Sequence, residues 1–265
     1  MNPFDVSRRG FVAQSLTLAA PVLLSSEALT TPGHAAEADA QTHRAPLKIV
    51  CIGAHPDDPE SGCAGVLARA AAAGHSVTVL YLTRGERGIH GSSLAEAAKT
   101  RSAEAEAACK IMGAKAIFAG QIDGEAEFTR PRLDEMLKIL KAEDPDVIFA
   151  HWPIDTHFDH QAASMLAVQA RLSLPRRPRL YFFEVNTGSQ SQGFQPNVYV
   201  DISAFVEKKK AALFAHPSQD GQGIWREHHE IVAAFRGREA GVTAAEAFVH
   251  LGRNTQTPPT LDFML

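Results

Sequence analysis

Short apolar runs alternate with segments of helical periodicity along most of the chain, and this alternation is the feature that most limits its fold. Regular alternation of strand and helix is typical of βαβ units, which place their strands parallel in one sheet. The run Ile49-Val50-Cys51-Ile52 is apolar throughout, as expected of a strand that helices cover on both faces. The predicted strands are 47–53, 76–82, 116–119, 147–150 and 180–183, and the predicted helices between them are 61–73, 94–112, 131–141 and 160–172. The pattern therefore predicts an α/β fold that is Rossmann-like and doubly wound, with a mostly parallel sheet and helices on both faces.

The remainder of the chain is predicted to complete the same single domain, which we place at residues 45–265. Residues 188–197 are rich in Gly, Ser and Gln and indicate a loop. A strand at 198–201, a helix at 204–215 and two further helical stretches at 225–235 and 243–251 are expected after it. With 45% apolar and 21% charged residues among 265, the composition is that of a globular protein and excludes a disordered chain.

The first forty residues have the features of an export signal. Ser7-Arg8-Arg9-Gly10-Phe11-Val12 is a twin-arginine pattern, and the apolar stretch that follows at 11–24 is too short and too polar to span a bilayer. Small residues at 33–40 then offer cleavage sites. An ordinary amphipathic N-terminal helix is the alternative. We expect residues 1–40 to be a cleaved twin-arginine signal peptide, and the mature protein to be periplasmic or extracellular, without a membrane span.

The net charge limits the kinds of partner that can be expected, and the positions of the cysteines indicate their state. A net charge of -4 provides no basic field for a phosphate backbone, so nucleic acid is not an expected partner. Cys51, Cys63 and Cys109 have no metal-binding spacing and lie in apolar runs, which predicts buried thiols. No pattern in the sequence indicates an oligomeric state.

Two segments rich in His and Asp follow the first and fourth predicted strands directly. The first is His55-Pro56-Asp57-Asp58-Pro59-Glu60, and the second is residues 151–160, HWPIDTHFDH. In a doubly wound sheet of order 3-2-1-4-5 these two strands are neighbours, and ligands bind outside their carboxyl ends. Either segment alone is also compatible with a turn or with surface histidines. Their joint placement favours one shared site.

The residue types in these segments indicate a catalytic divalent metal. His55 and Asp58, with two residues between them, can turn toward one point, and a histidine of the second segment would complete a set of two histidines and one carboxylate. Asp57 and His157 remain. A carboxylate beside an activated water can take its proton, and a histidine across the site can stabilise an oxyanion or protonate a leaving amine.

The chain resembles the LmbE-like or PIG-L family of zinc-dependent de-N-acetylases. The resemblance extends from about Lys48 to Phe248 and rests on 54–60 (AHPDDPE), Gly65, 83–86 (TRGE), Arg101-x-x-Glu104-Ala105 and Asp155-x-His157-x-Asp159-His160. A softer similarity to bacterial members covers 197–202, Lys208 and 216–219 (HPSQ). Ala64 stands where many members have glycine, which affects only local helix packing.

This resemblance implies a role for each motif residue. His55, Asp58 and His160 are implied to bind zinc, with iron(II) as the alternative metal, and Asp57 is implied to be the general base. His157 is implied to be the charged partner of the oxyanion and leaving group, with Asp159 orienting it.

Six further polar residues are candidates for binding substrate. Arg84 and Glu86 follow the second predicted strand, Asp123 and Asn186 follow the third and fifth, and His151 ends the fourth. Arg101 has helical spacing to Glu96 and Glu104, so a surface ion pair is the simpler expectation for it.

These observations lead to one expected function and to rivals. We expect a metal-dependent hydrolase that removes acetyl from a 2-acetamido sugar or glycoconjugate and releases acetate and a free amine. The alternatives are an amidase acting on a larger sugar-linked amide such as a thiol conjugate, and a carbohydrate-binding protein without activity. Iron oxygenation also uses two histidines and a carboxylate, but it needs no spare carboxylate such as Asp57.

Overall fold

The computed structural model describes residues 45–185 and 189–252. The predicted signal peptide at 1–40 and the candidate Asn186 lie outside the described residues. The described residues belong to one compact unit. None of the helices in the described part of the chain is long and apolar enough to cross a membrane.

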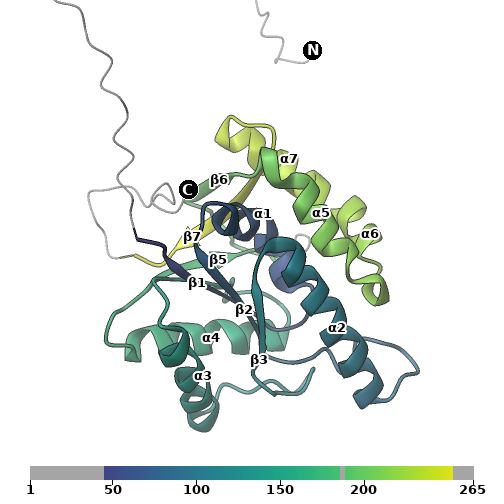
Figure 1. Cartoon of the computed structure of the whole chain (residues 1–265), viewed down its shortest axis with the longest axis vertical. Coiled ribbons are helices and arrows are strands. Elements are labelled where there is room, and N and C mark those ends of the chain that lie inside the picture. Colours follow the sequence, from purple (N-terminus) through teal and green to yellow (C-terminus); the bar gives the residue numbers. More distant parts are fainter. Residues whose placement is uncertain (1–44, 186–188, 253–265) are drawn as a thin grey trace, which may run out of the picture. The chain divides into compact units, whose positions relative to one another are not determined.

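A seven-stranded mixed sheet in the order β3-β2-β1-β4-β5-β7-β6 organises the described residues (Figure 1). Five strands are parallel neighbours and have the predicted order 3-2-1-4-5: β1 Lys48–Gly53, β2 Ser76–Tyr81, β3 Lys115–Phe118, β4 Val147–His151 and β5 Arg179–Phe183. Two antiparallel strands extend this sheet beyond β5: β7 Ala245–His250 and, at the edge, β6 Val198–Asp201. The fold prediction is confirmed.

Helices cover both faces of the sheet. One apolar core lies between the sheet and the helices α1 Asp58–Ala72, α2 Leu94–Met112 and α5 Val206–Phe214, and the other lies under α3 Arg130–Glu143 and α4 Phe158–Ser173. Strand β1 contributes Ile49 and Cys51 to the first core and Val50 and Ile52 to the second, which explains why its sequence is apolar throughout. Cys51, Cys63 and Cys109 are buried free thiols.

Besides α5, further helical segments lie between β6 and β7 in the chain. They are the 3₁₀ turns η1 Ser203–Phe205 and η2 Pro217–Gln219, the helix α6 Gly221–Ile224, the π-helical turn η3 Trp225–His229 and the helix α7 Glu230–Ala240. The helical predictions for 204–215 and 225–235 are thus confirmed.

The predicted helix at 243–251 is wrong, because residues 245–250 form strand β7. Ala245, Glu246 and Ala247 favour helix by intrinsic propensity, but propensity is a weak prior that tertiary pairing overrides. In the structure β7 pairs with β5 on one side and β6 on the other. Its first four residues are buried.

Candidate metal centre

The first half of the site follows β1 and is held in a strained turn. Asp57 has φ 106° and ψ -25°, in the left-handed region that residues other than glycine rarely adopt. Its backbone N–H donates to Glu60 Oε2 at 3.1 Å, and its carbonyl accepts from Ser61 N at 2.8 Å. Helix α1 then begins at Asp58. Because the turn is fixed on both sides, the adjacent carboxylates of Asp57 and Asp58 have separate environments.

The second half of the site follows β4. His157 is the N-cap of α4, and its Nδ1 accepts from Asp159 N at 3.2 Å. Asp155 Oδ1 in turn accepts from His157 N at 2.8 Å. Asp159 and His160 therefore lie in the first turn of α4, with Asp159 fully buried.

Asp58 lies at the spacing of metal ligands from both His55 and His160. His55 Nδ1 lies 3.2 Å from Asp58 Oδ2, and His160 Nε2 lies 3.3 Å from Asp58 Oδ1. In a tetrahedral zinc site with bonds of about 2.0 Å, ligand atoms are about 3.3 Å apart. The donor set, two imidazoles and one carboxylate, is also one that zinc accepts, so the residues fit the ion that the sequence implied. The described residues form three overlapping groups of candidate ligands: His55 with His157 and His160, Asp58 with His151 and His160, and His55 with Asp123 and Asp159. The three predicted ligands are divided among these groups, and no single group holds all of them.

Buried carboxylates orient both histidines. His160 Nδ1 lies 2.9 Å from Asp155 Oδ2, and His55 Nε2 lies 2.9 Å from Asp159 Oδ2 and 3.2 Å from Asp123 Oδ1. Carboxylates commonly hold the second ring nitrogen of a ligating histidine in this way, which fixes the tautomer and ring orientation. His160 Nε2 and His55 Nδ1 are then left to face Asp58.

The same carboxylates make the site strongly attractive to positive charge. Burial alone lowers the pKa of His160, but Asp58 and Asp155 outweigh burial and raise that pKa to about 9. For His55, burial is likewise outweighed, by Asp123, Asp159 and Asp58, and the pKa is raised well above its ordinary value. A metal ion would take the place of the protons that these imidazoles attract.

Asp57 belongs to a different environment from Asp58. Its Oδ2 accepts from Arg101 Nη2 at 3.1 Å, and the same nitrogen donates to the Pro56 carbonyl at 2.5 Å. Burial raises the pKa of Asp57, Arg101 opposes that rise and Asp58 adds to it, so that the pKa is raised to about 6. A carboxyl group with a pKa near neutrality is suited to proton transfer.

The expectation of a surface ion pair for Arg101 is wrong. Arg101 is only 3% exposed, and it reaches the turn after β1 rather than Glu96 or Glu104. Glu96 caps its own helix with Ser93, and Glu104 accepts from the backbone and the hydroxyl of Ser218. Helical periodicity alone could not show that Arg101 lies on the face of α2 that turns toward the site.

His157 lies beside the ligands in a form suited to donating a hydrogen bond. Since Nδ1 accepts from Asp159 N, the neutral ring carries its proton on Nε2. Burial, followed by the nearby His160 and His55, lowers the pKa of His157 and favours this neutral form over the charged one that was expected. Its ring centroid lies 4.8 Å from that of His55 and 4.6 Å from that of His160.

The carboxylate of Asp159 does not orient His157 as expected. It pairs with His55 and accepts backbone N–H groups from Gly124 at 2.7 Å and Ala126 at 3.2 Å. Only the backbone N–H of Asp159 contacts the His157 ring. Asp159 therefore ties the loop after β3 to the site.

The remaining candidates divide between the site and its surroundings. Asp123 faces His55, and the fully buried His151 lies with Nε2 3.3 Å from Asp58 Oδ2 while accepting from Ala54 N at 3.0 Å. Burial and then His160 lower the pKa of His151 to about 4, so it is neutral. Glu86 is buried and braces the loops by accepting from Arg84 N and Asp123 N. The exposed Arg84 packs over the ring of Phe118 instead of joining the cluster.

Three residues at the site were not assigned a role from the sequence. Asp155 holds His160, and Glu60 holds the backbone of Asp57 while accepting from Tyr81 Oη at 2.5 Å. Asp155 was visible as the first residue of the motif that contains His157 and His160. Glu60 was likewise visible as the last residue of the motif at 54–60, but Tyr81 carried no such signal, since its ring lies in the core.

Comparison with known proteins relates this site to de-N-acetylases. Residues 50–171 match the family model described as PIG-L, GlcNAc-PI de-N-acetylase. The diacetylchitobiose deacetylase of Thermococcus kodakarensis is 30% identical over 217 residues, which cover 75% of this chain and 81% of that protein. A conserved protein of Thermus thermophilus has a solved structure that is 33% identical, with a TM-score of 0.67 over 80% of this chain and 96% of that one.

One relative has a different activity in its name. The 4-oxalmesaconate hydratase of Pseudomonas putida is 27% identical over 222 residues, covering 75% of this chain and 84% of that protein. The chain is therefore similar, over most of its length, both to proteins named as deacetylases and to one named as a hydratase. The substrate has to be argued from the site residues.

Proposed function

Because the chain belongs to the PIG-L (LmbE-like) family of de-N-acetylases, we propose that it is a zinc-dependent hydrolase that removes the N-acetyl group from a 2-acetamido sugar or glycoconjugate. The observation that carries the proposal is that the adjacent carboxylates of Asp57 and Asp58 have different partners. Asp58 lies among the histidines at ligand spacing, whereas Asp57 is turned to Arg101 and has a pKa of about 6. A protein that only bound metal or sugar would have no use for this second carboxylate.

Three residues would hold the metal: His55, Asp58 and His160. When bound there, zinc polarises the acetamide carbonyl and makes a nearby water more acidic. Asp155 and Asp159 keep the two imidazoles in the ligating tautomer.

Asp57 is the proposed general base. Its ionised carboxylate takes a proton from the attacking water and later passes a proton to the departing amine. Arg101 holds the carboxylate in place and keeps it from becoming too weak an acid to ionise at neutral pH. The strained backbone at Asp57 aims this side chain apart from that of Asp58.

His157 is the proposed donor to the carbonyl oxygen. In the neutral form that the structure favours, Nε2–H is available to donate a hydrogen bond as negative charge develops on that oxygen. The developing charge also raises the proton affinity of the ring. This donor role therefore does not require the charged imidazole that the family resemblance implied.

The twin-arginine pattern supports a location outside the cytoplasm for this activity. We propose that the protein is exported folded and acts on periplasmic or extracellular N-acetylated sugars. Residues 8 and 9 carry this part of the proposal, independently of the site.

Acetate release from a panel of N-acetylated mono- and oligosaccharides, with metal analysis of the same preparation, tests the proposed function. We expect acetate and free amine in equal amounts, with about one zinc per site. Acetate release must stop when the metal is chelated. Metal-loaded protein that is inactive on the panel but cleaves a larger sugar-linked amide would favour an amidase, and iron as the bound metal would overturn the zinc assignment.

A further inference from the structure

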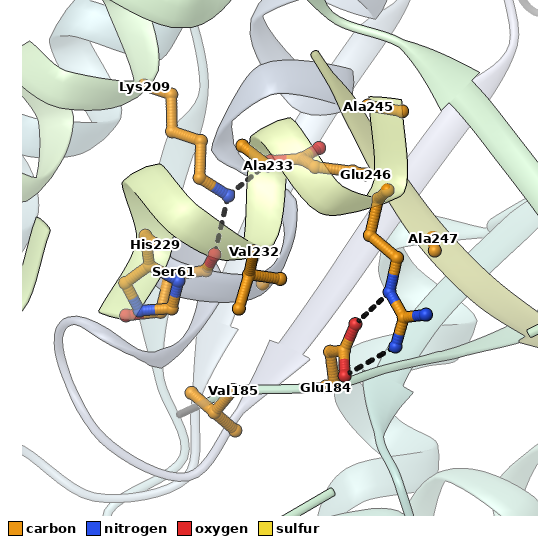
Figure 2. A pocket seen from close by; sticks show the side chains of 12 residues that line it. Ser61, Glu184, Val185, Lys209, His229, Val232, Ala233, Ala245, Glu246 and Ala247 are labelled. Carbon is orange, nitrogen blue, oxygen red and sulfur yellow. Dashed lines mark hydrogen bonds and ion pairs between the residues drawn. The ribbon is translucent and has the colours of Figure 1, made fainter. Parts of the chain in front are cut away.

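A buried ion pair contacts the main chain of α1 one turn beyond the proposed metal ligand Asp58. Lys209 on α5 and Glu246 on β7 have side chains only 3% and 4% exposed, with Nζ 2.6 Å from Oε1. Figure 2 shows the Lys209 ammonium between Ser61 and Glu246, with a cavity beside them. This pair is not part of the ligand cluster, and the mechanism above does not use it.

Both members of the pair bond to helix backbone. Lys209 Nζ donates to the Ser61 carbonyl at 2.5 Å, and the Glu246 carboxylate accepts from Gly65 N at 2.9 Å and Val66 N at 2.7 Å. In an α-helix Gly65 N–H would have the Ser61 carbonyl as its partner. Here each of these two groups has a charged partner from another element, which fixes the helix in space at this point.

The contact leads directly to the proposed base. Ser61, whose carbonyl Lys209 holds, donates its own N–H to the carbonyl of Asp57 at 2.8 Å. Glu60, next to it, holds the N–H of Asp57. A displacement of Ser61 along the helix axis would therefore move the strained turn that separates Asp57 from Asp58.

Close packing leaves the first half of α1 little other freedom. A Cβ added at Gly62 would lie 2.3 Å from the Phe183 ring, and one at Gly65 would lie 2.7 Å from the Ile202 side chain. The helix is thus packed closely against β5 and the chain after β6. Because backbone C=O and N–H groups point along the helix axis, the Lys209–Glu246 pair adds a restraint along that axis.

We propose that Lys209 and Glu246 are positioning residues for the metal centre. By holding α1 at Ser61, Gly65 and Val66, they fix the position of its first turn along the helix axis. That position in turn determines where Asp57 and Asp58 lie. The proposal rests on the proposed function where it predicts an effect on kcat. Its predicted effects on zinc affinity and on the cobalt spectrum do not depend on that function. It assigns a role in the site to 206–250, a part of the chain outside the family match at 50–171.

The test replaces both charges at once, since one buried charge without its partner would itself destabilise the fold. Lys209→Met with Glu246→Gln keeps the side-chain lengths and removes the ion pair. We expect the zinc dissociation constant, measured by competition with a chelator, to rise at least about 10-fold, within the range known for residues that support metal ligands. The visible spectrum of the cobalt(II)-substituted protein should change, and kcat should fall more than KM changes.

The matched control is a half-buried ion pair beside the same cavity. Arg236 and Glu184 form a bidentate pair with side chains 13% and 11% exposed, and neither has a hydrogen bond to α1 among those of the described residues. Arg236→Met with Glu184→Gln should lower the melting temperature to a comparable extent while leaving zinc affinity and the cobalt spectrum unchanged. Equal losses of zinc affinity in both double variants would overturn the proposal, because they would reflect general destabilisation.

Zinc affinity and a cobalt spectrum like those of the wild type in the folded Lys209→Met, Glu246→Gln protein would also overturn it. If that variant does not fold, Lys209→Arg is measured on the same criteria, since it keeps the buried charges paired and changes only the geometry of the contact with the Ser61 carbonyl. If the wild-type protein releases no acetate, the proposed function fails, while the zinc and cobalt measurements still decide the positioning role.

Discussion

The guanidinium of Arg101 lies against the carboxylate of Asp57, with Nη2 3.1 Å from Oδ2. This positive charge opposes the rise that burial causes in the pKa of Asp57. Arg101 is therefore positioned to control the pH at which the proposed base becomes active.

Replacing Arg101 should move the acid limb of the pH profile upward. In Arg101→Met the lowering influence is lost, so the pKa of Asp57 rises above about 6 and ionisation requires higher pH. The acid limb of kcat/KM should shift up by about 1 unit or more, the usual effect of an adjacent opposite charge. Arg132→Met, on the exposed side of α3, is the control and should leave the limb in place. A loss of rate without a shift would assign Arg101 to substrate binding alone.

Asp57→Asn should separate proton transfer from metal binding. Asparagine keeps the size of the side chain but cannot accept the proton, so kcat should fall by about 10² to 10⁴ while zinc content stays at the wild-type level. Asp58→Asn should lose rate through weaker metal binding, and added zinc should partly restore it. Turnover close to wild type in zinc-replete Asp57→Asn protein would remove the proposed base.

The ligands and their supports should differ in the size of their effects on metal binding. His55→Ala, Asp58→Ala and His160→Ala should each lose most of the bound zinc, since too few protein ligands remain. Asp155→Asn should keep the site but weaken zinc binding by about 10- to 100-fold, because His160 loses the carboxylate that orients it. Metal analysis and chelator competition measure both. Full zinc occupancy in Asp58→Ala would contradict the ligand set.

The signal sequence is tested separately from the site. Arg8→Lys together with Arg9→Lys should leave the precursor in the cytoplasm, because the arginine pair is the feature that the export route recognises. Cell fractionation and the size of the protein on a gel report the outcome. Export at the wild-type level would show that this pair is not used.

The sequence was most informative where chain order alone brings residues together. The segments at 55–60 and 151–160 could be placed in one site because the first and fourth strands of such a sheet are neighbours, whereas His160 as the second histidine ligand was implied only by the family resemblance. The partners of Arg101 could not be predicted, since its helix had a plausible surface pairing as well. Strand β7 was missed because Ala245, Glu246 and Ala247 are good helix formers, and only pairing with β5 and β6 makes them a strand.

Strand β7 has a further consequence for how the protein is made. It is the last strand of the sheet to leave the ribosome, yet it lies inside the sheet, and β6 is joined to β5 only through it. A nascent chain that has emerged as far as His160 already carries every proposed zinc ligand but lacks Glu246. We therefore expect the zinc site to reach its final affinity only after β7 has left the ribosome, so that nascent chains stalled before Glu246 hold the metal more weakly than chains that include β7.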